Sequence, residues 1–137
     1  MKRLTLMSFL VILSCVTAFS GVANATDAAD VAAQHSTKAQ AYVACGFYSN
    51  LSHMNDHKPS DEHFFLKAGA NEFIKSTESL GSVAEREDIL IDYASYVASQ
   101  QALLWDQPGL NDLKTVEQAA KKLYAAANCD LLKEAIK

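Results

Sequence analysis

Proline is scarce in this sequence, with 2 among 137 residues, while half of the residues are apolar. A disordered or low-complexity chain has a different composition, so these two classes are excluded. The segment after residue 25 is long enough to bury one sizeable core and too short for two ordinary domains. We therefore predict a single domain over residues 26–137.

Positive charge is also scarce. Arg86 is the one arginine after residue 25, and residues 26–137 carry 10 basic and 16 acidic side chains, a formal net charge of −6. Nucleic-acid sites need clustered positive charge, which excludes a nucleic-acid partner and also disfavours binding to an anionic membrane surface. A negative domain favours encounter with a basic protein partner.

The signatures of common catalytic and cofactor sites are missing. The sequence has no Gly-x-Ser-x-Gly elbow, no glycine-rich phosphate loop and no Cys-x-x-Cys pair, which argues against a serine hydrolase, a nucleotide enzyme and a redox catalyst. There is no Cys-x-x-Cys-His, and no histidine follows His63, which argues against haem. We predict that the protein is not an enzyme and has no cofactor.

The N-terminal residues follow the three-part pattern of a secretory signal peptide. Met1-Lys2-Arg3 is followed by an uncharged apolar run to Val22 and by the small-x-small site Ala23-Asn24-Ala25. This order predicts a signal peptide over residues 1–25, cleaved after Ala25, and a periplasmic or secreted protein. No later segment is long and apolar enough to predict a membrane span.

Two other interpretations of the N-terminus stay open. The apolar run could be a retained membrane anchor, although it contains several serine, threonine and glycine residues. Ile12-Leu13-Ser14-Cys15 loosely resembles a lipobox, which would place a lipid on Cys15. The apolar residues continue past Cys15, whereas a lipidated cysteine normally ends such a run.

Two cysteines, Cys45 and Cys129, lie after the signal. Export places them in an oxidising compartment, and an even number of cysteines favours pairing. We predict a Cys45–Cys129 disulfide, worth about 4.5 kcal/mol by the chain-entropy estimate for so long a loop. Two separately buried thiols are the alternative.

Helical periodicity runs through every long segment. It predicts an all-α fold, an irregular four-helix bundle with helices at roughly 27–54, 61–80, 83–105 and 112–136. Thr26 is expected to cap the first helix, and Ser82-Val83-Ala84-Glu85 has the pattern of a capping box for the third. The residues expected to face inward on the third helix are Leu90, Tyr93, Ala94, Val97, Gln101 and Leu104.

The predicted disulfide conflicts with a regular bundle. At a rise of about 1.5 Å per residue, the two cysteines of a regular bundle lie at different heights along its axis. A disulfide needs their Cα atoms within about 7 Å. We therefore expect helix tilt, or a break in the last helix near Asn128.

Three histidines near the first loop could bind a metal. His53 and His57 have i,i+4 spacing, and His63 could approach from the next helix. Imidazole with nearby carboxylate suits zinc or copper. The alternative is an ordinary solvated loop, because Pro59 disfavours helix just before it. We predict no tight metal site, and name these three residues as the ones that would carry it.

Trp105 is the only tryptophan and precedes the Pro108-Gly109 turn. Tryptophan is enriched at binding hot spots, so Trp105 is a possible partner contact. The alternative is an anchor that folds onto the bundle, since tryptophan is usually largely buried.

Two local stretches carry a resemblance to known proteins. They are Ala-Tyr-Val-Ala-Cys45 on the first helix and Asn-Cys129-Asp-Leu-Leu-Lys-Glu on the last. Together with a signal peptide and an acidic helical domain, this layout resembles the small periplasmic immunity proteins that neutralise type VI amidase effectors. It is also similar to type II secretion pilotins and to phage-encoded periplasmic exclusion proteins.

The expected function follows from these patterns. We predict an exported, non-catalytic binder of another periplasmic or envelope protein, such as an inhibitor, immunity factor or adaptor. The alternative is a small-ligand or metal carrier that uses the His53–His63 loop.

Overall fold

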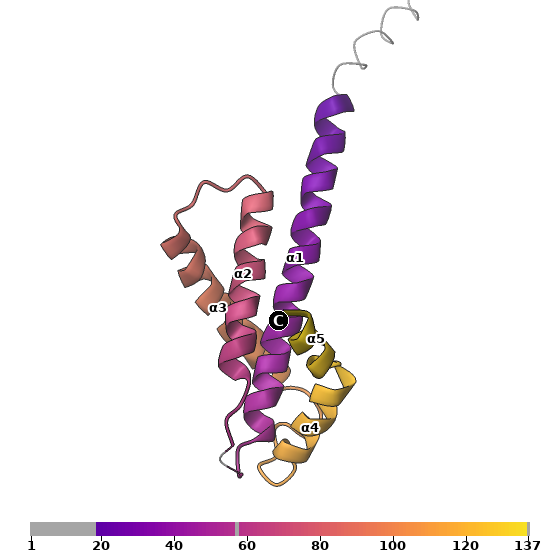
Figure 1. The fold of residues 1–137 in the computed structure, drawn as a ribbon, viewed down its shortest axis with the longest axis vertical. Helices are drawn as coiled ribbons and strands as arrows, with labels where there is room; N and C mark the ends of the chain where they lie inside the picture. Colours follow the sequence, from indigo (N-terminus) through magenta and orange to yellow (C-terminus); the bar gives the residue numbers. More distant parts are fainter. Residues whose placement is uncertain (1–18, 57, 137) are drawn as a thin grey trace, which may run out of the picture.

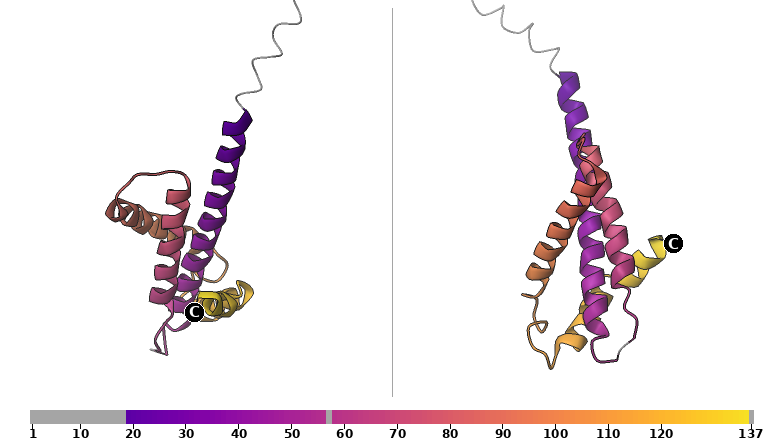
Figure 2. Two further views of the ribbon diagram at one scale, coloured as in Figure 1. Left: turned by 45° about the horizontal axis from the view of Figure 1, so that its top comes forward. Right: turned by 90° about the vertical axis from the view of Figure 1, so that its left-hand side faces the viewer.

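The computed structural model describes residues 19–56 and 58–136, which form an all-α fold, as predicted. Five helices follow one another in this part of the chain: α1 (Phe19–Ser52), α2 (Glu62–Ser79), α3 (Arg86–Leu104), α4 (Val116–Ala126) and α5 (Cys129–Ile136). Helices α1 and α2 lie side by side, and α3 lies on the opposite side of α1 from α4 and α5 (Figures 1 and 2). Within these residues no helix is long and apolar enough to cross a membrane.

The first helix begins earlier than predicted. It starts at Phe19 instead of residue 27, and Thr26, the expected N-cap, lies inside it. Alanines are frequent around Thr26 and no proline interrupts the segment, so nothing in the local sequence stops the helix there. Residues 1–18, including Cys15 and most of the predicted signal peptide, lie outside the described residues.

The expected capping box before the third helix is wrong. Helix α3 begins at Arg86, with extended Glu85 (φ −66°, ψ 149°) at the N-cap position and no side-chain cap. The Ser82 hydroxyl instead accepts a hydrogen bond from the backbone N–H of Ala84, at 3.3 Å. Serine side chains compete with helix formation in this way, by bonding to backbone two residues away.

The predicted last helix is two helices, and the break lies at Asn128, the second of the two alternatives that the cysteine spacing suggested. Asn128 has a left-handed backbone (φ 53°) between α4 and α5, a conformation that asparagine tolerates better than most residues. The break brings Cys129 to Cys45, with Cα atoms 5.5 Å apart, and the predicted disulfide is present. Both cysteines are fully buried.

The core surrounds the C-terminal half of α1. One cluster joins α1 to α4 and the loop before it, and its buried members are Phe47, Tyr48, Leu51, Leu110, Val116 and Ala120. A second cluster joins the disulfide to Phe65 of α2. Gly46 lets α2 approach closely, because a Cβ atom there would lie 3.3 Å from the carbonyl oxygen of Glu62.

Candidate functional site

A polar cleft lies where the end of α1 meets the start of α2 and the α4–α5 junction. Its volume is about 260 Å³. The lining residues are Ser49, Ser52 and His53 from α1, Asp61 before α2, Lys121 and Tyr124 from α4, and Asp130 from α5. Of these seven residues, His53 is the one that the sequence predicted as a candidate metal ligand.

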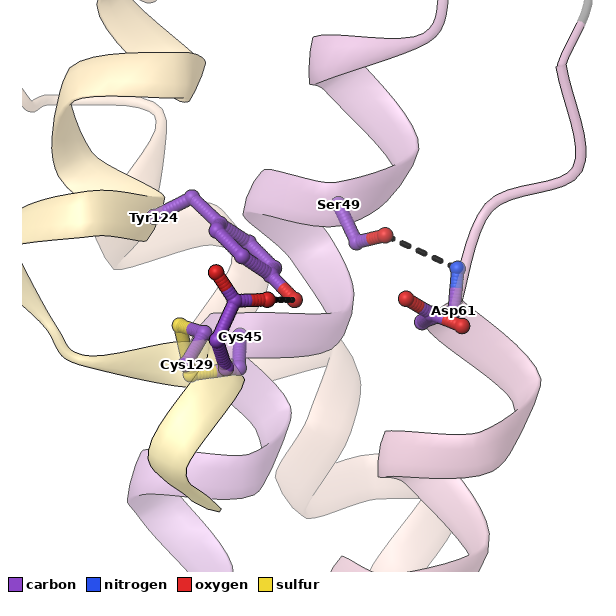
Figure 3. Close-up of a disulfide and its surroundings, with 6 residues drawn as sticks. Cys45, Ser49, Asp61, Tyr124 and Cys129 are labelled. Atoms are coloured by element: carbon purple, nitrogen blue, oxygen red, sulfur yellow. Dashed lines mark hydrogen bonds between the residues drawn. A yellow bond between two sulfur atoms is a disulfide. The ribbon is translucent and has the colours of Figure 1, made fainter. Parts of the chain in front are cut away.

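Ser49 of α1 fixes the start of α2. Ser49 is only 2% exposed, and its hydroxyl accepts a hydrogen bond from the backbone N–H of Asp61, at 2.8 Å (Figure 3). The Ser52 hydroxyl donates to the Ser49 carbonyl at 2.9 Å. Asp61 in turn accepts a hydrogen bond from Lys133 of α5, at 2.7 Å. The cleft is therefore held by contacts from three helices.

Tyr124 and Asp130 stand beside the disulfide at one end of the cleft. The Tyr124 hydroxyl donates to Asp130 Oδ1 at 3.1 Å, the hydrogen bond drawn as the dashed line from Tyr124 in Figure 3. Burial, this hydrogen bond, and the negative charges of Asp130 and Asp61 raise the pKa of Tyr124 to about 12. Tyr124 therefore remains a protonated hydrogen-bond donor at neutral pH, next to two carboxylates. We call Asp61, Tyr124 and Asp130 the carboxylate end.

His53 and Lys121 form the other end, which we call the basic end. His53 Nδ1 lies 3.2 Å from Asp56. The backbone N–H of Lys58 first, and then the His53 and Lys58 side chains, lower the pKa of Asp56 to about 2. Lys121 pairs with Glu117, whose hydrogen bond and charge raise the pKa of Lys121. Lys121 thus stays charged at neutral pH.

The structure tests the histidine prediction only in part. His53 lines the cleft, whereas His63 is exposed at the start of α2. His57 lies outside the described residues, so a site made by all three histidines stays a prediction. Across residues 19–56 and 58–136, no three His, Cys, Asp or Glu side chains are grouped to hold a metal ion.

Trp105 is both packed against the core and partly exposed, so it has features of both predicted alternatives, the anchor and the partner contact. Its ring meets Phe47 of the core edge-on, with centroids 5.2 Å apart and planes at 88°. It is nevertheless 41% exposed. Trp105 is therefore anchored on one side by the core and presents its other side to solvent.

Further exposed apolar residues continue from Trp105 along α3. At helical spacing, one face carries Ile91, Ala94, Ala98, Ala102 and Trp105, all exposed. We call this set the α3 outer stripe. Ile91 is 65% exposed. Three exposed acidic residues lie beside the two ends of the stripe: Glu87, Asp88 and Asp106.

The outer stripe corrects the predicted inner face of the third helix. The structure buries Ile89 and Tyr93, and it exposes Leu90 and Ala94, which were expected to face inward. Apolar residues occur almost all around α3, so their period does not single out one buried face. Only contact with α1 and α2 decides which side is covered.

No protein-family model, curated protein or solved structure matches this chain. The likeness to amidase immunity proteins therefore stays a hypothesis, and function has to be argued from the cleft and the outer stripe.

The cleft residues come from four segments, and no local spacing joins them. The cysteine pairing was the one signal that could have placed some of them together. Ser49 lies one helical turn after Cys45, and Asp130 directly follows Cys129. A pairing of the two cysteines therefore implies that Ser49 and Asp130 are neighbours.

Proposed function

We propose that this protein is exported and acts by binding another protein without catalysing a reaction, as an inhibitor, immunity factor or adaptor. The observation that carries the proposal is the α3 outer stripe. Contiguous exposed apolar surface bordered by polar residues is typical of sites that another protein covers.

The shape of the outer stripe suits a partner helix. Ile91 and Trp105 stand at its two ends, about 21 Å apart at 1.5 Å per residue. Between them lie only alanines, whose small side chains allow the axis of a second helix to come close. Trp105 is a rigid aromatic anchor of the kind that dominates binding energy at protein interfaces.

The charges beside the stripe indicate the chemistry of the partner. Glu87 and Asp88 lie at one end and Asp106 at the other, all exposed. Opposite charges across an interface speed association and reject partners of the wrong sign. The partner we propose therefore presents an apolar surface flanked by lysine or arginine.

Two features support an exported protein. Residues 1–25 have the order of a secretory signal peptide. The Cys45–Cys129 disulfide fits an oxidising compartment, since disulfides are rare in reducing ones. An exported helical domain of this kind would meet other periplasmic or envelope proteins.

A small-ligand carrier is the second candidate. The polar cleft favours it, because His53 of the predicted loop is one of its lining residues.

Site-specific photo-crosslinking in the exporting cell tests the protein-binding proposal. A photoreactive residue at Ala98, in the middle of the outer stripe, should give one defined protein adduct. The matched control is the same residue at Leu113, which is 80% exposed and lies outside the stripe. The absence of an adduct at position 98, or the same adducts at both positions, would refute the proposal.

A further inference from the structure

Within the described part of the chain, each of the two carboxylates in the polar cleft has one oxygen that accepts a hydrogen bond from another residue and one that does not. Asp61 Oδ2 accepts a hydrogen bond from Lys133, and Asp130 Oδ1 accepts one from Tyr124. Among the described residues, Asp61 Oδ1 and Asp130 Oδ2 have no hydrogen-bond donor. Asp61, Asp130 and Lys133 together carry a formal charge of −1, which one ammonium group would balance.

The basic end offers the complementary charge. Lys121 uses one of its ammonium N–H groups on Glu117, which leaves two others for a ligand. His53 also lines the cleft. Lys121 lies one turn before Tyr124 on α4, and His53 lies one turn after Ser49 on α1. Each basic residue thus lies about one helical turn, along its own helix, from Tyr124 or from Ser49, which contacts Asp61.

We propose that the polar cleft binds a small zwitterion, either a free α-amino acid or a dipeptide. Its ammonium would lie between Asp61 and Asp130, and its carboxylate would pair with Lys121. This inference goes beyond protein binding by α3, because it names a ligand class for the second candidate function. The cleft volume of about 260 Å³ is just below that of sites for drug-sized ligands, about 300–1,000 Å³.

The cleft is preformed by contacts that do not involve the ligand. The disulfide fixes Cys129, and so the adjacent Asp130, against α1. Lys133 joins α5 to Asp61, and Ser49 fixes the backbone at Asp61. Preorganised groups lose little conformational entropy on binding, which favours affinity for a small ligand.

Titration of the ¹⁵N-labelled, disulfide-linked protein tests this proposal by nuclear magnetic resonance. The probes are the common free α-amino acids and their glycyl dipeptides, each added alone up to millimolar concentration. At least one probe should give saturable shifts at the amides of Ser49, His53, Asp61 and Tyr124. N-acetylation or C-amidation of that probe should weaken binding by about tenfold or more, since each removes a charge-assisted hydrogen bond.

Two variants assign the two charges of the ligand, and a third serves as their control. Asp130→Asn should weaken binding of the zwitterion but not of its N-acetylated form, which has no ammonium group. Lys121→Gln should weaken binding of the zwitterion but not of its C-amidated form, which has no carboxylate. Asp112→Asn, in the loop before α4, is the matched control and should bind normally. Three results would each overturn the proposal. They are no binding of any probe, an N-acetylated probe that binds as tightly as the unmodified one, and an Asp112→Asn variant that weakens binding as much as the two cleft variants do.

The outer-stripe variant Ile91→Glu separates this proposal from the protein-binding one. It should leave zwitterion binding unchanged, because Ile91 does not line the cleft. Loss of ligand binding in Ile91→Glu with a native-like spectrum would contradict the assignment to the cleft.

Discussion

The hydroxyl of Tyr93 on α3 occupies the space that a side chain at Gly69 of α2 would need. This hydroxyl donates a hydrogen bond to the Leu66 carbonyl at 2.9 Å, and Tyr93 is buried. The contact joins α3 to α2, and it therefore sets which side of α3 remains exposed as the outer stripe.

We expect Gly69→Ala to lower the free energy of unfolding by about 1–3 kcal/mol, because the added methyl displaces the Tyr93 hydroxyl in a packed site. In a Tyr93→Phe background the same change should be neutral or stabilising, since the obstructing oxygen is gone and alanine favours helix over glycine. Chemical denaturation of the four proteins measures this coupling. Additive effects of the two substitutions would contradict the contact.

The sequence allowed the helices and the disulfide to be predicted, since apolar periodicity and cysteine number are local or countable signals. It also indicated either helix tilt or a break in the last helix near Asn128, because the two cysteines do not meet in a regular bundle. The start of α1 at Phe19 and the exposed face of α3 were missed. The start of α1 was missed because Thr26 was expected to be an N-cap, although nothing in the local sequence stops the helix there. The exposed face of α3 depends on the neighbouring helices, because α3 has apolar residues on nearly every side.

The Cys45–Cys129 disulfide closes a long loop, because its two cysteines are 84 positions apart in the sequence. The Cys45→Ser, Cys129→Ser double variant should be less stable by about 4.5 kcal/mol, because its unfolded chain regains conformational freedom. Thermal unfolding of oxidised, reduced and double-variant protein measures this loss. Unchanged melting temperature after complete reduction would contradict a stabilising role.

Glu72 joins α1 to α2 through His35, with His35 Nδ1 2.7 Å from its carboxylate, and also pairs with Lys75 at 2.7 Å. Burial raises the pKa of Glu72, but the hydrogen bonds from Lys75 and His35 outweigh it and hold the pKa below the ordinary 4.5. A lowered folded-state pKa gives stability that is present above pH 4.5 and is lost as the pH falls through the folded value.

Glu72→Gln should therefore melt at a lower temperature than the wild type at neutral pH. The difference should shrink as the pH falls below about 4.5, where the wild-type carboxylate becomes protonated. Glu78→Gln, at an exposed position of the same helix, is the control. A Glu72→Gln difference that persists at low pH would show that packing, and not the charge, is responsible.

Salt should slow association with the protein partner. Glu87, Asp88 and Asp106 lie exposed beside the outer stripe, and steering by exposed charges weakens as ionic strength rises. Stopped-flow or surface-based kinetics with the crosslinked partner should show a falling association rate and a nearly constant dissociation rate. An association rate independent of salt would contradict a basic partner.

The central claim is that a partner protein binds through the α3 outer stripe, and the dissociation constant of the crosslinked partner tests it most directly. It is measured for the wild type, for the stripe variants Ile91→Glu and Trp105→Ala, and for the control Leu113→Glu. The two outer-stripe variants should raise the dissociation constant by about tenfold or more, as expected for interface anchors worth at least 1.4 kcal/mol. Leu113→Glu adds the same charge at another exposed apolar position and should bind like the wild type. Wild-type affinity in both outer-stripe variants would contradict binding through α3.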